Sequence, residues 1–301
     1  MYLYNRSLLS RPKIIEFMKL QLTHNCKNNK HNRTPKKKGF YSDPILYFVL
    51  FLLIVFNVVS TTAVAQTNPA NPFKAPLYWN PYEYCYTKDG SIPEDIWSQN
   101  IDWVEANLKP YGYNMICIDG WGDIKANITY NENGYLTSHS DRWTHDFAWW
   151  SANLQSRGMT LGMYQNPLWV YKDAANAGAL IKGTSIPLSN IIDLSENGSF
   201  GFTWVQINND GAEEYVKGYI QHFADMGIKY LRVDFLSWFE SGYDRNIGRV
   251  GPSRPKADYE KALRWMREAC DANDMLLSLV MPNLANEAEL EQKYGHMIRI
   301  N

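Results

Sequence analysis

Cysteine and histidine are scarce in this 301-residue sequence, which contains 4 and 6 of them. The cysteines, Cys26, Cys85, Cys117 and Cys270, lie far apart along the chain. No close pair of the kind found in zinc knuckles occurs, and the three cysteines after residue 65 are an odd number. We therefore expect no disulfide framework, no metal centre and no cofactor.

Basic patches and nucleotide-binding motifs are also lacking after residue 65. Residues 1–65 hold 10 of the chain's 30 basic residues and 2 of its 31 acidic ones, which leaves 20 basic and 29 acidic residues and a net charge of −9. This surplus of acid disfavours nucleic acid as a partner. No G-x-G-x-x-G motif follows the first predicted strand, which disfavours a dinucleotide-binding fold.

One long apolar run is present, Ile45–Val59. It follows three consecutive lysines, Lys36–Lys38, and precedes the small-residue segment Ala63–Ala65. This arrangement predicts a secretory signal, and hence a secreted or periplasmic protein. The run is shorter than the roughly 20 residues of a membrane helix, but an uncleaved membrane anchor is the alternative. Since the leading region is long, Met18 is a second candidate start. We divide the chain into a basic leader with its signal, 1–65, and a catalytic domain, 66–301.

Short apolar strands alternate with amphipathic helices through the second part. The predicted strands are 76–79, 115–119, 161–165, 230–234, 276–280 and 296–300. Five helices are predicted between them, and a long polar connection spans 166–209. Such alternation indicates an α/β fold with parallel strands. We predict a (β/α)8 TIM barrel that is incomplete, because about six βα units are present and the chain ends on the sixth strand.

Polar residues gather where the predicted strands end. They are Asn80, Glu83, Asp119, Gln165, Asn166, Asp234, Asn283 and Asn301. In a TIM barrel the carboxyl ends of the strands form the active site, so this pattern predicts a site there.

Two carboxylates, Asp119 and Asp234, stand at strand ends among tryptophan and tyrosine. Each could instead cap the next segment or pair with an arginine. Two of them in aromatic surroundings favour a glycosidase, because aromatic faces stack on sugar rings and carboxylates cleave glycosidic bonds. Asp and Glu also bind hard cations, but no dense ligand cluster is visible. Ser237 lacks the nucleophile-elbow motif of a serine hydrolase.

Four segments between about Pro76 and Asn301 resemble glycoside hydrolase family 27, the α-galactosidase (melibiase) group, and its clan D relatives. "LYWNPYEY" resembles the family's W-N-S-W strand, and "YGYNMICIDGWGD" resembles G-Y-x-Y-V-x-I-D-D-C-W. "LQSRGMTLGMY" is similar to S-K-G-L-K-L-G-I-Y, and "MGIKYLRVDFLSW" to G-x-D-Y-L-K-Y-D-N-C. The resemblance implies a TIM barrel and a retaining hydrolase of terminal sugars on oligo- or polysaccharides.

The resemblance also implies roles for individual residues. Asp234 matches the nucleophile, Asp119 an acid that bonds sugar hydroxyls, and Arg232 a position where the family usually has lysine. The substrate-binding residues we expect are Trp79, Asp119, Trp121, Gln165, Arg232, Trp238 and Arg299. The family's acid/base residue follows the sixth strand, so we expect it just after Asn301 and expect the 301-residue chain to be a poor hydrolase.

Two segments depart from the family pattern. Gly120 stands where the family has a second acid, and Met281–Leu284 replaces its C-E-W segment. Both segments help to select galactose in the family. Isomaltodextranase-like and β-L-arabinopyranosidase-like activities therefore stay open beside the α-galactosidase-like one. A non-catalytic carbohydrate-binding barrel and a metal-dependent polysaccharide deacetylase are the hypotheses from other classes.

Overall fold

The computed structural model divides into two units, Met1–Thr67 and Asn68–Asn301. It describes residues 74–88, 92–119, 129–194, 202–244, 246, 248–282 and 284–299. The predicted leader and signal lie outside these ranges. Among the described residues, no helix is both long and apolar enough to cross a membrane.

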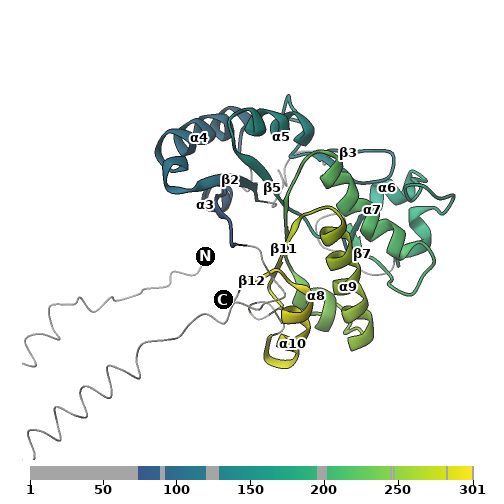
Figure 1. Cartoon of the computed structure of the whole chain (residues 1–301). Coiled ribbons are helices and arrows are strands. Elements are labelled where there is room, and N and C mark those ends of the chain that lie inside the picture. Colours follow the sequence, from purple (N-terminus) through teal and green to yellow (C-terminus); the bar gives the residue numbers. More distant parts are fainter. Residues whose placement is uncertain are drawn as a thin grey trace, which may run out of the picture. The chain divides into compact units, whose positions relative to one another are not determined.

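Six parallel strands form the central sheet of the described part (Figure 1). Along the sheet they are β1 (Leu77–Trp79), β2 (Tyr113–Ile118), β5 (Thr160–Tyr164), β8 (Tyr230–Val233), β11 (Leu276–Val280) and β12 (Met297–Arg299). Their spatial order equals their order in the sequence, and each neighbouring pair is parallel. This arrangement confirms the prediction of an incomplete TIM barrel.

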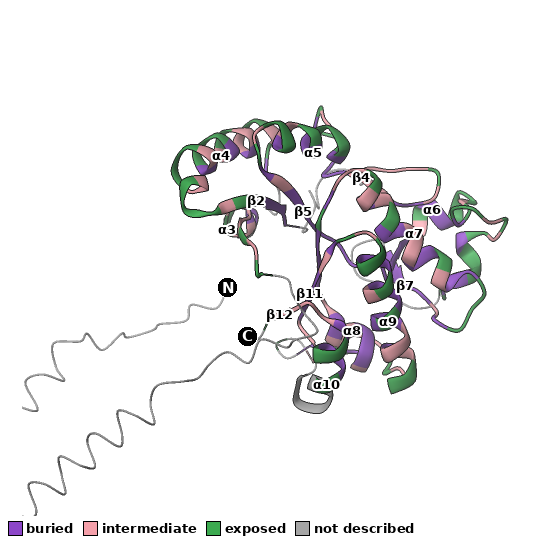
Figure 2. Cartoon of the chain, in the orientation of Figure 1, coloured by how far each residue is buried: buried purple, intermediate pink, exposed green. Residues whose placement is uncertain are grey.

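Helices cover the outer face of the curved sheet (Figure 1). One long helix lies between each two successive strands of this sheet. These helices are α4 (Glu94–Asn107), α5 (Phe147–Ser156), α7 (Ala212–Asp225), α9 (Lys256–Ala272) and α10 (Leu284–Tyr294). Helix α4 packs on β2, α5 on β5 and α9 on β11. The helices are buried toward the sheet and exposed on the opposite side, as Figure 2 shows for α7 and α9. Burial of these apolar faces is what stabilises each helix in place.

Alternate residues of each strand face opposite sides of the sheet. The outward set, which includes Ile116, Leu161 and Leu231, belongs to the large core under the helices. The inward set forms a second, smaller cluster around Met115, Cys117 and Tyr230, with Tyr78, Leu276 and Met297 against it. Gly162 leaves room for this cluster, since a Cβ there would lie 3.0 Å from the Tyr230 ring.

The connections contain structure that the polar sequence did not predict. Antiparallel pairs form between β3 (Thr129–Tyr130) and β4 (Leu136–Ser138), between β6 (Trp169–Tyr171) and β7 (Phe202–Trp204), and between β9 (Tyr243–Asp244) and β10 (Gly248–Arg249). Short helices are α3 (Tyr82–Thr87), α6 (Lys172–Asn176) and α8 (Leu236–Ser241), with 3-10 turns at Lys109–Tyr111 and Leu188–Ile191.

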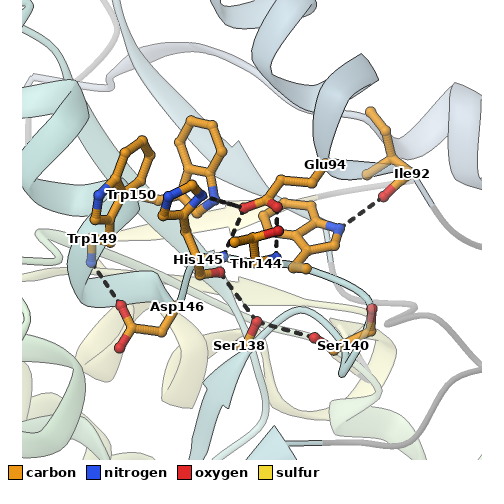
Figure 3. A network of polar contacts seen from close by, with 10 residues as sticks. Ile92, Glu94, Ser138, Ser140, Thr144, His145, Asp146, Trp149 and Trp150 are labelled. Carbon is orange, nitrogen blue, oxygen red and sulfur yellow. Dashed lines mark hydrogen bonds and ion pairs between the residues drawn. The ribbon is translucent and has the colours of Figure 1, made fainter.

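Glu94 fixes the connection between β4 and α5 from the first turn of α4 (Figure 3). Its carboxylate accepts hydrogen bonds from the backbone N–H of Thr144 at 2.6 Å and of His145 at 2.9 Å. The Trp150 indole donates to it at 3.0 Å, and the His145 ring lies 3.0 Å away. Burial alone would raise the pKa of Glu94, but these hydrogen bonds outweigh it and hold the pKa below its usual value.

The three cysteines of the described part, Cys85, Cys117 and Cys270, are buried. Burial raises the pKa of the Cys117 and Cys270 thiols far above the usual value. No group of three or more potential metal-ligating His, Cys, Asp or Glu side chains occurs among the described residues.

Candidate active site

The candidate site begins with a buried ion pair between two strand ends. Asp119 directly follows β2, and Arg232 lies on β8. The Arg232 Nη1 donates to Asp119 Oδ2 at 2.6 Å, and both side chains are almost completely buried. The Arg232 guanidinium also lies over the Tyr164 ring, 5.5 Å from its centroid. Burial would lower the pKa of Arg232, but Asp119 and Asp234 keep it raised, so the cation is retained.

Asp234 follows Arg232 by two residues, and therefore faces the same side of the sheet. It is 7 % exposed. Burial raises its pKa, while the Phe235 N–H, the Arg232 and Arg299 cations and the Tyr164 hydroxyl act in the opposite direction. The Phe235 N–H donates to Asp234 Oδ1 at 2.7 Å. Asp234 is thus a shielded carboxylate whose pKa is raised on balance by burial, although two cations and two donors favour its charged form.

Tyr164, the last residue of β5, completes this group. Its hydroxyl is buried beside both Asp234 and Asp119, and burial together with these carboxylates raises its pKa well above the usual value. The hydroxyl consequently stays protonated and donates to Asp234. Sequence reasoning missed Tyr164, although "LGMYQ" places it at a strand end directly before Gln165, which was singled out.

The backbone at Asp234 is held from the neighbouring strand. Asn166 is fully buried, and its Nδ2 donates to the Asp234 carbonyl at 2.7 Å while its Oδ1 accepts from Leu168 N at 2.9 Å. Phe235 adopts φ +61°, a left-handed conformation that costs free energy in a residue with a side chain. The direction of the Asp234 side chain is therefore set by a strained turn that Asn166 braces.

The other predicted residues lie in different surroundings. Trp79 packs on Trp97 of α4, with ring centroids 5.9 Å apart. The Gln165 amide donates to Tyr171 and Tyr219, at 3.2 and 2.8 Å. Trp238 packs on Phe235 at 4.5 Å and donates to Asp244 at 2.8 Å.

The structure therefore brings together Asp119, Arg232 and Asp234, with Arg299 close enough to act on Asp234 electrostatically. It places Trp79 and the Gln165 amide nitrogen against structural partners. Trp121 and Asn283 lie outside the described residues. The acid/base residue expected after Asn301 lies outside the sequence, so the structure does not bear on it.

The chain is similar to a bacterial enzyme of known structure. It is 42 % identical over 235 residues to the isomalto-dextranase of Arthrobacter globiformis, covering 75 % of this chain and 36 % of that protein. The structure of that enzyme complexed with panose superposes with a TM-score of 0.71 at 40 % identity, over 75 % of this chain and 39 % of that one. This chain thus spans less than half the length of that relative.

More distant structures share the fold alone. A family 27 β-L-arabinopyranosidase from Geobacillus stearothermophilus, in complex with arabinose, has a TM-score of 0.58 at 19 % identity, with 74 % of this chain and 52 % of that chain covered. The chain has a family 27-like barrel fold. An α-galactosidase from Thermus thermophilus has a TM-score of 0.50 at 21 % identity, with 76 % and 44 % covered. No family profile matches the chain.

Within this family 27-like barrel, the observed cluster lies at the carboxyl ends of β2, β5 and β8. That is where barrel enzymes hold their substrates. A shielded carboxylate at this edge has the chemistry of a glycosidase nucleophile, which attacks a carbon that develops positive charge.

Proposed function

We propose that this chain carries the nucleophile half of a retaining glycoside hydrolase. The observation that supports it best is Asp234, a buried carboxylate at a barrel strand end that the Tyr164 hydroxyl contacts and the Arg232 cation influences. In the proposed reaction a carboxylate oxygen of Asp234 attacks the anomeric carbon and the glycosidic oxygen departs, which leaves a glycosyl ester on the enzyme. Water then cleaves that ester.

The leaving oxygen needs a proton, and retaining glycosidases supply it from a second carboxyl group about 5 Å from the first. We place that residue just after Asn301, as the resemblance implies. Arg299, two residues before Asn301, would then serve both carboxylates, because its cation already favours the ionised form of Asp234. Asp119 and Arg232 would hold hydroxyl groups of the bound sugar.

For the substrate we propose an α-glucan of the dextran type. The likeness to a dextran-cleaving enzyme at 42 % identity supports it, as does the complex of that enzyme with panose. An α-galactoside is the second candidate, supported by the sequence resemblance and the fold. Arg232 in place of the family's lysine, and Gly120 in place of its second acid, favour the glucan. We further propose export of the protein, on the strength of the apolar run at 45–59.

The first chemical step can be tested with activated substrates. An aryl glycoside with a good leaving group needs little protonation, so glycosylation of Asp234 is measurable even where acid catalysis is weak. The full chain is mixed with aryl α-glucoside, aryl α-galactoside and aryl β-L-arabinopyranoside, and phenol release and protein mass are followed. We expect a glucosyl adduct on Asp234 from the first substrate alone.

The same experiment separates the competing hypotheses. Binding of dextran without phenol release or adduct would favour the non-catalytic carbohydrate-binding barrel. The metal-dependent deacetylase predicts instead zinc in the purified protein and activity on an acetylated polysaccharide that a chelator abolishes. An adduct only from the galactoside would replace the glucan proposal with the galactoside one.

A further inference from the structure

A pocket of about 520 Å³ lies apart from the Asp119–Arg232–Asp234 cluster. Its walls are the β3–β4 turn, with Tyr130 and Glu132, and the segment from α6 onward, with Ala177, Leu180 and Thr184. No member of the catalytic cluster lines it. Its volume falls in the range of about 300–1,000 Å³ that is typical of small-molecule sites.

The pocket belongs to the same face of the barrel as the candidate active site. The β3–β4 hairpin lies in the connection after β2, which ends beside Asp119, and α6 lies in the connection after β5, which ends at Tyr164. Such connections build the substrate-binding surface of TIM barrels. The Tyr130 ring stacks on Tyr171 at 6.2 Å, and Tyr171 accepts a hydrogen bond from Gln165, the residue after Tyr164.

The lining combines an apolar surface with a few polar groups. Ala174, Ala177 and Ile181 contribute methyl groups, and Leu180 is 44 % exposed. Beside them Gly178 faces open space, with no atom within 4 Å of where a Cβ would lie. This space is available to a ligand ring.

Two polar groups of the lining remain available for hydrogen bonds. The Tyr130 hydroxyl and the Glu132 carboxylate have no hydrogen-bond partner in the described part of the chain, whereas Asn131 and Asn133 are used within the turn and toward Leu180. The described residues that line the pocket include no lysine or arginine, so an anionic ligand is disfavoured. A neutral ring with one apolar face and several hydroxyl groups fits this lining, which is the chemistry of a pyranose.

We propose that this pocket is a remote subsite that binds a glucosyl unit of an α-glucan away from the bond that is cleaved. The inference rests on the proposed function for the choice of sugar. The pocket itself is defined by the β3–β4 turn and α6. It gives long substrates a contact that short ones lack, so affinity rises with chain length.

Calorimetric titration of the full chain carrying Asp234→Asn, which prevents turnover, tests this subsite. The probes are isomalto-oligosaccharides of two to eight glucose units. We expect longer probes to bind more tightly than the disaccharide. Ala177→Leu, which fills the pocket from an exposed position, and Glu132→Gln should each weaken binding of the longest probe about tenfold, or 1.4 kcal/mol, with the disaccharide unchanged. Glu214→Gln, at an exposed position on α7, is the matched control.

The subsite proposal is wrong if the parent and both pocket variants bind the longest probe with equal affinity at unchanged melting temperature. It is also wrong if the parent protein binds none of the probes. The aryl glycoside assay reports separately on catalysis. Length-dependent binding that the pocket variants abolish, without any glycosyl adduct, would leave the subsite standing and remove the hydrolase function. A glycosyl adduct, together with pocket variants that bind the longest probe as tightly as the parent, would support the hydrolase function and remove the subsite.

Discussion

The inward faces of the strands differ between their two halves. Toward the amino-terminal ends, Met115 and Cys117 on β2 and Tyr230 on β8 form an apolar cluster. Asp119, two residues after Cys117, faces the same side of the sheet. Arg232 and Asp234, two and four residues after Tyr230, do so as well. Because alternate residues of a strand face the same side, both sets face the interior of the barrel. The amino-terminal half of this interior is apolar and packed, the carboxyl-terminal half carries the reactive groups, and the two halves differ in the chemistry of their side chains. Burial stabilises the first set and costs free energy in the second.

Replacing Asp234 with asparagine should have the largest effect on the reactive end. We expect turnover of an aryl glycoside to fall by several orders of magnitude, because the amide cannot form the glycosyl ester, while sugar binding persists. Steady-state rates and calorimetric binding measure the two. Since burial raises the Asp234 pKa, and activity needs the ionised form, the acid limb of kcat/KM in the parent should lie above the ordinary Asp range. Normal turnover in the variant would exclude Asp234 as the nucleophile.

Breaking the Asp119–Arg232 pair should destabilise the fold most. Arg232→Met leaves Asp119 buried without that cation, and loss of one partner of a buried pair costs about 3–5 kcal/mol. Urea unfolding measures the change. The double variant Arg232→Met, Asp119→Asn should recover part of the loss, because position 119 then no longer carries a buried charge. If the double variant is no more stable than the single one, the pair is not the source of the effect.

Overpacking the apolar end should cost less. In Gly162→Ala the new methyl group would lie 3.0 Å from Tyr230, 3.2 Å from Met115 and 3.3 Å from Cys117. Such crowding typically costs about 1–3 kcal/mol. Gly251→Ala is the control, since open space surrounds that position. Equal thermal melting of the two variants would show that the interior cluster is looser than described.

The smallest effect concerns Glu94, outside both halves of the interior. Glu94→Gln weakens the hydrogen bonds to Thr144 and His145, and we expect a loss of about 1 kcal/mol at pH 7. Because folding lowers the Glu94 pKa, its ionic contribution is present above the pKa of the unfolded chain and is lost as pH falls through the folded pKa. The difference between parent and variant should therefore shrink in acid. The exposed Asp95→Asn, one residue along α4, is the control.

The strand pattern could be predicted because parallel strands buried on both faces are continuous apolar runs. Leu276–Val280 matches β11, and the other five predicted strands agree with the structure to within about two residues. The β3–β4 and β6–β7 pairs could not be found this way. Each strand has only two or three residues, too few for a pattern to show, and turn chemistry decides the pairing.

The site was predictable only where strand ends carry unusual residues. Asp119 and Asp234 were visible because charges interrupt apolar runs, and Arg232 was selected from the family resemblance. Gln165 was selected as a polar residue at a strand end, yet its amide nitrogen turns toward Tyr171 of β6 and Tyr219 of α7. Tyr164 was missed because a tyrosine in a buried strand is ordinary, and only the fold sets its hydroxyl beside two carboxylates.

The buried thiols can be used to measure local opening of the fold. A thiolate reacts with alkylating reagents and a thiol does not, so Cys117 and Cys270 are protected both by burial and by raised pKa. Cys117 lies inside the barrel, whereas Cys270 lies on the buried face of α9, in the helical layer. The rate at which each is modified under native conditions measures how often its own layer opens. Peptide mass analysis gives the two modification rates. Equal rates would indicate that the barrel interior and the helical layer open together, and different rates would indicate that one opens more often than the other.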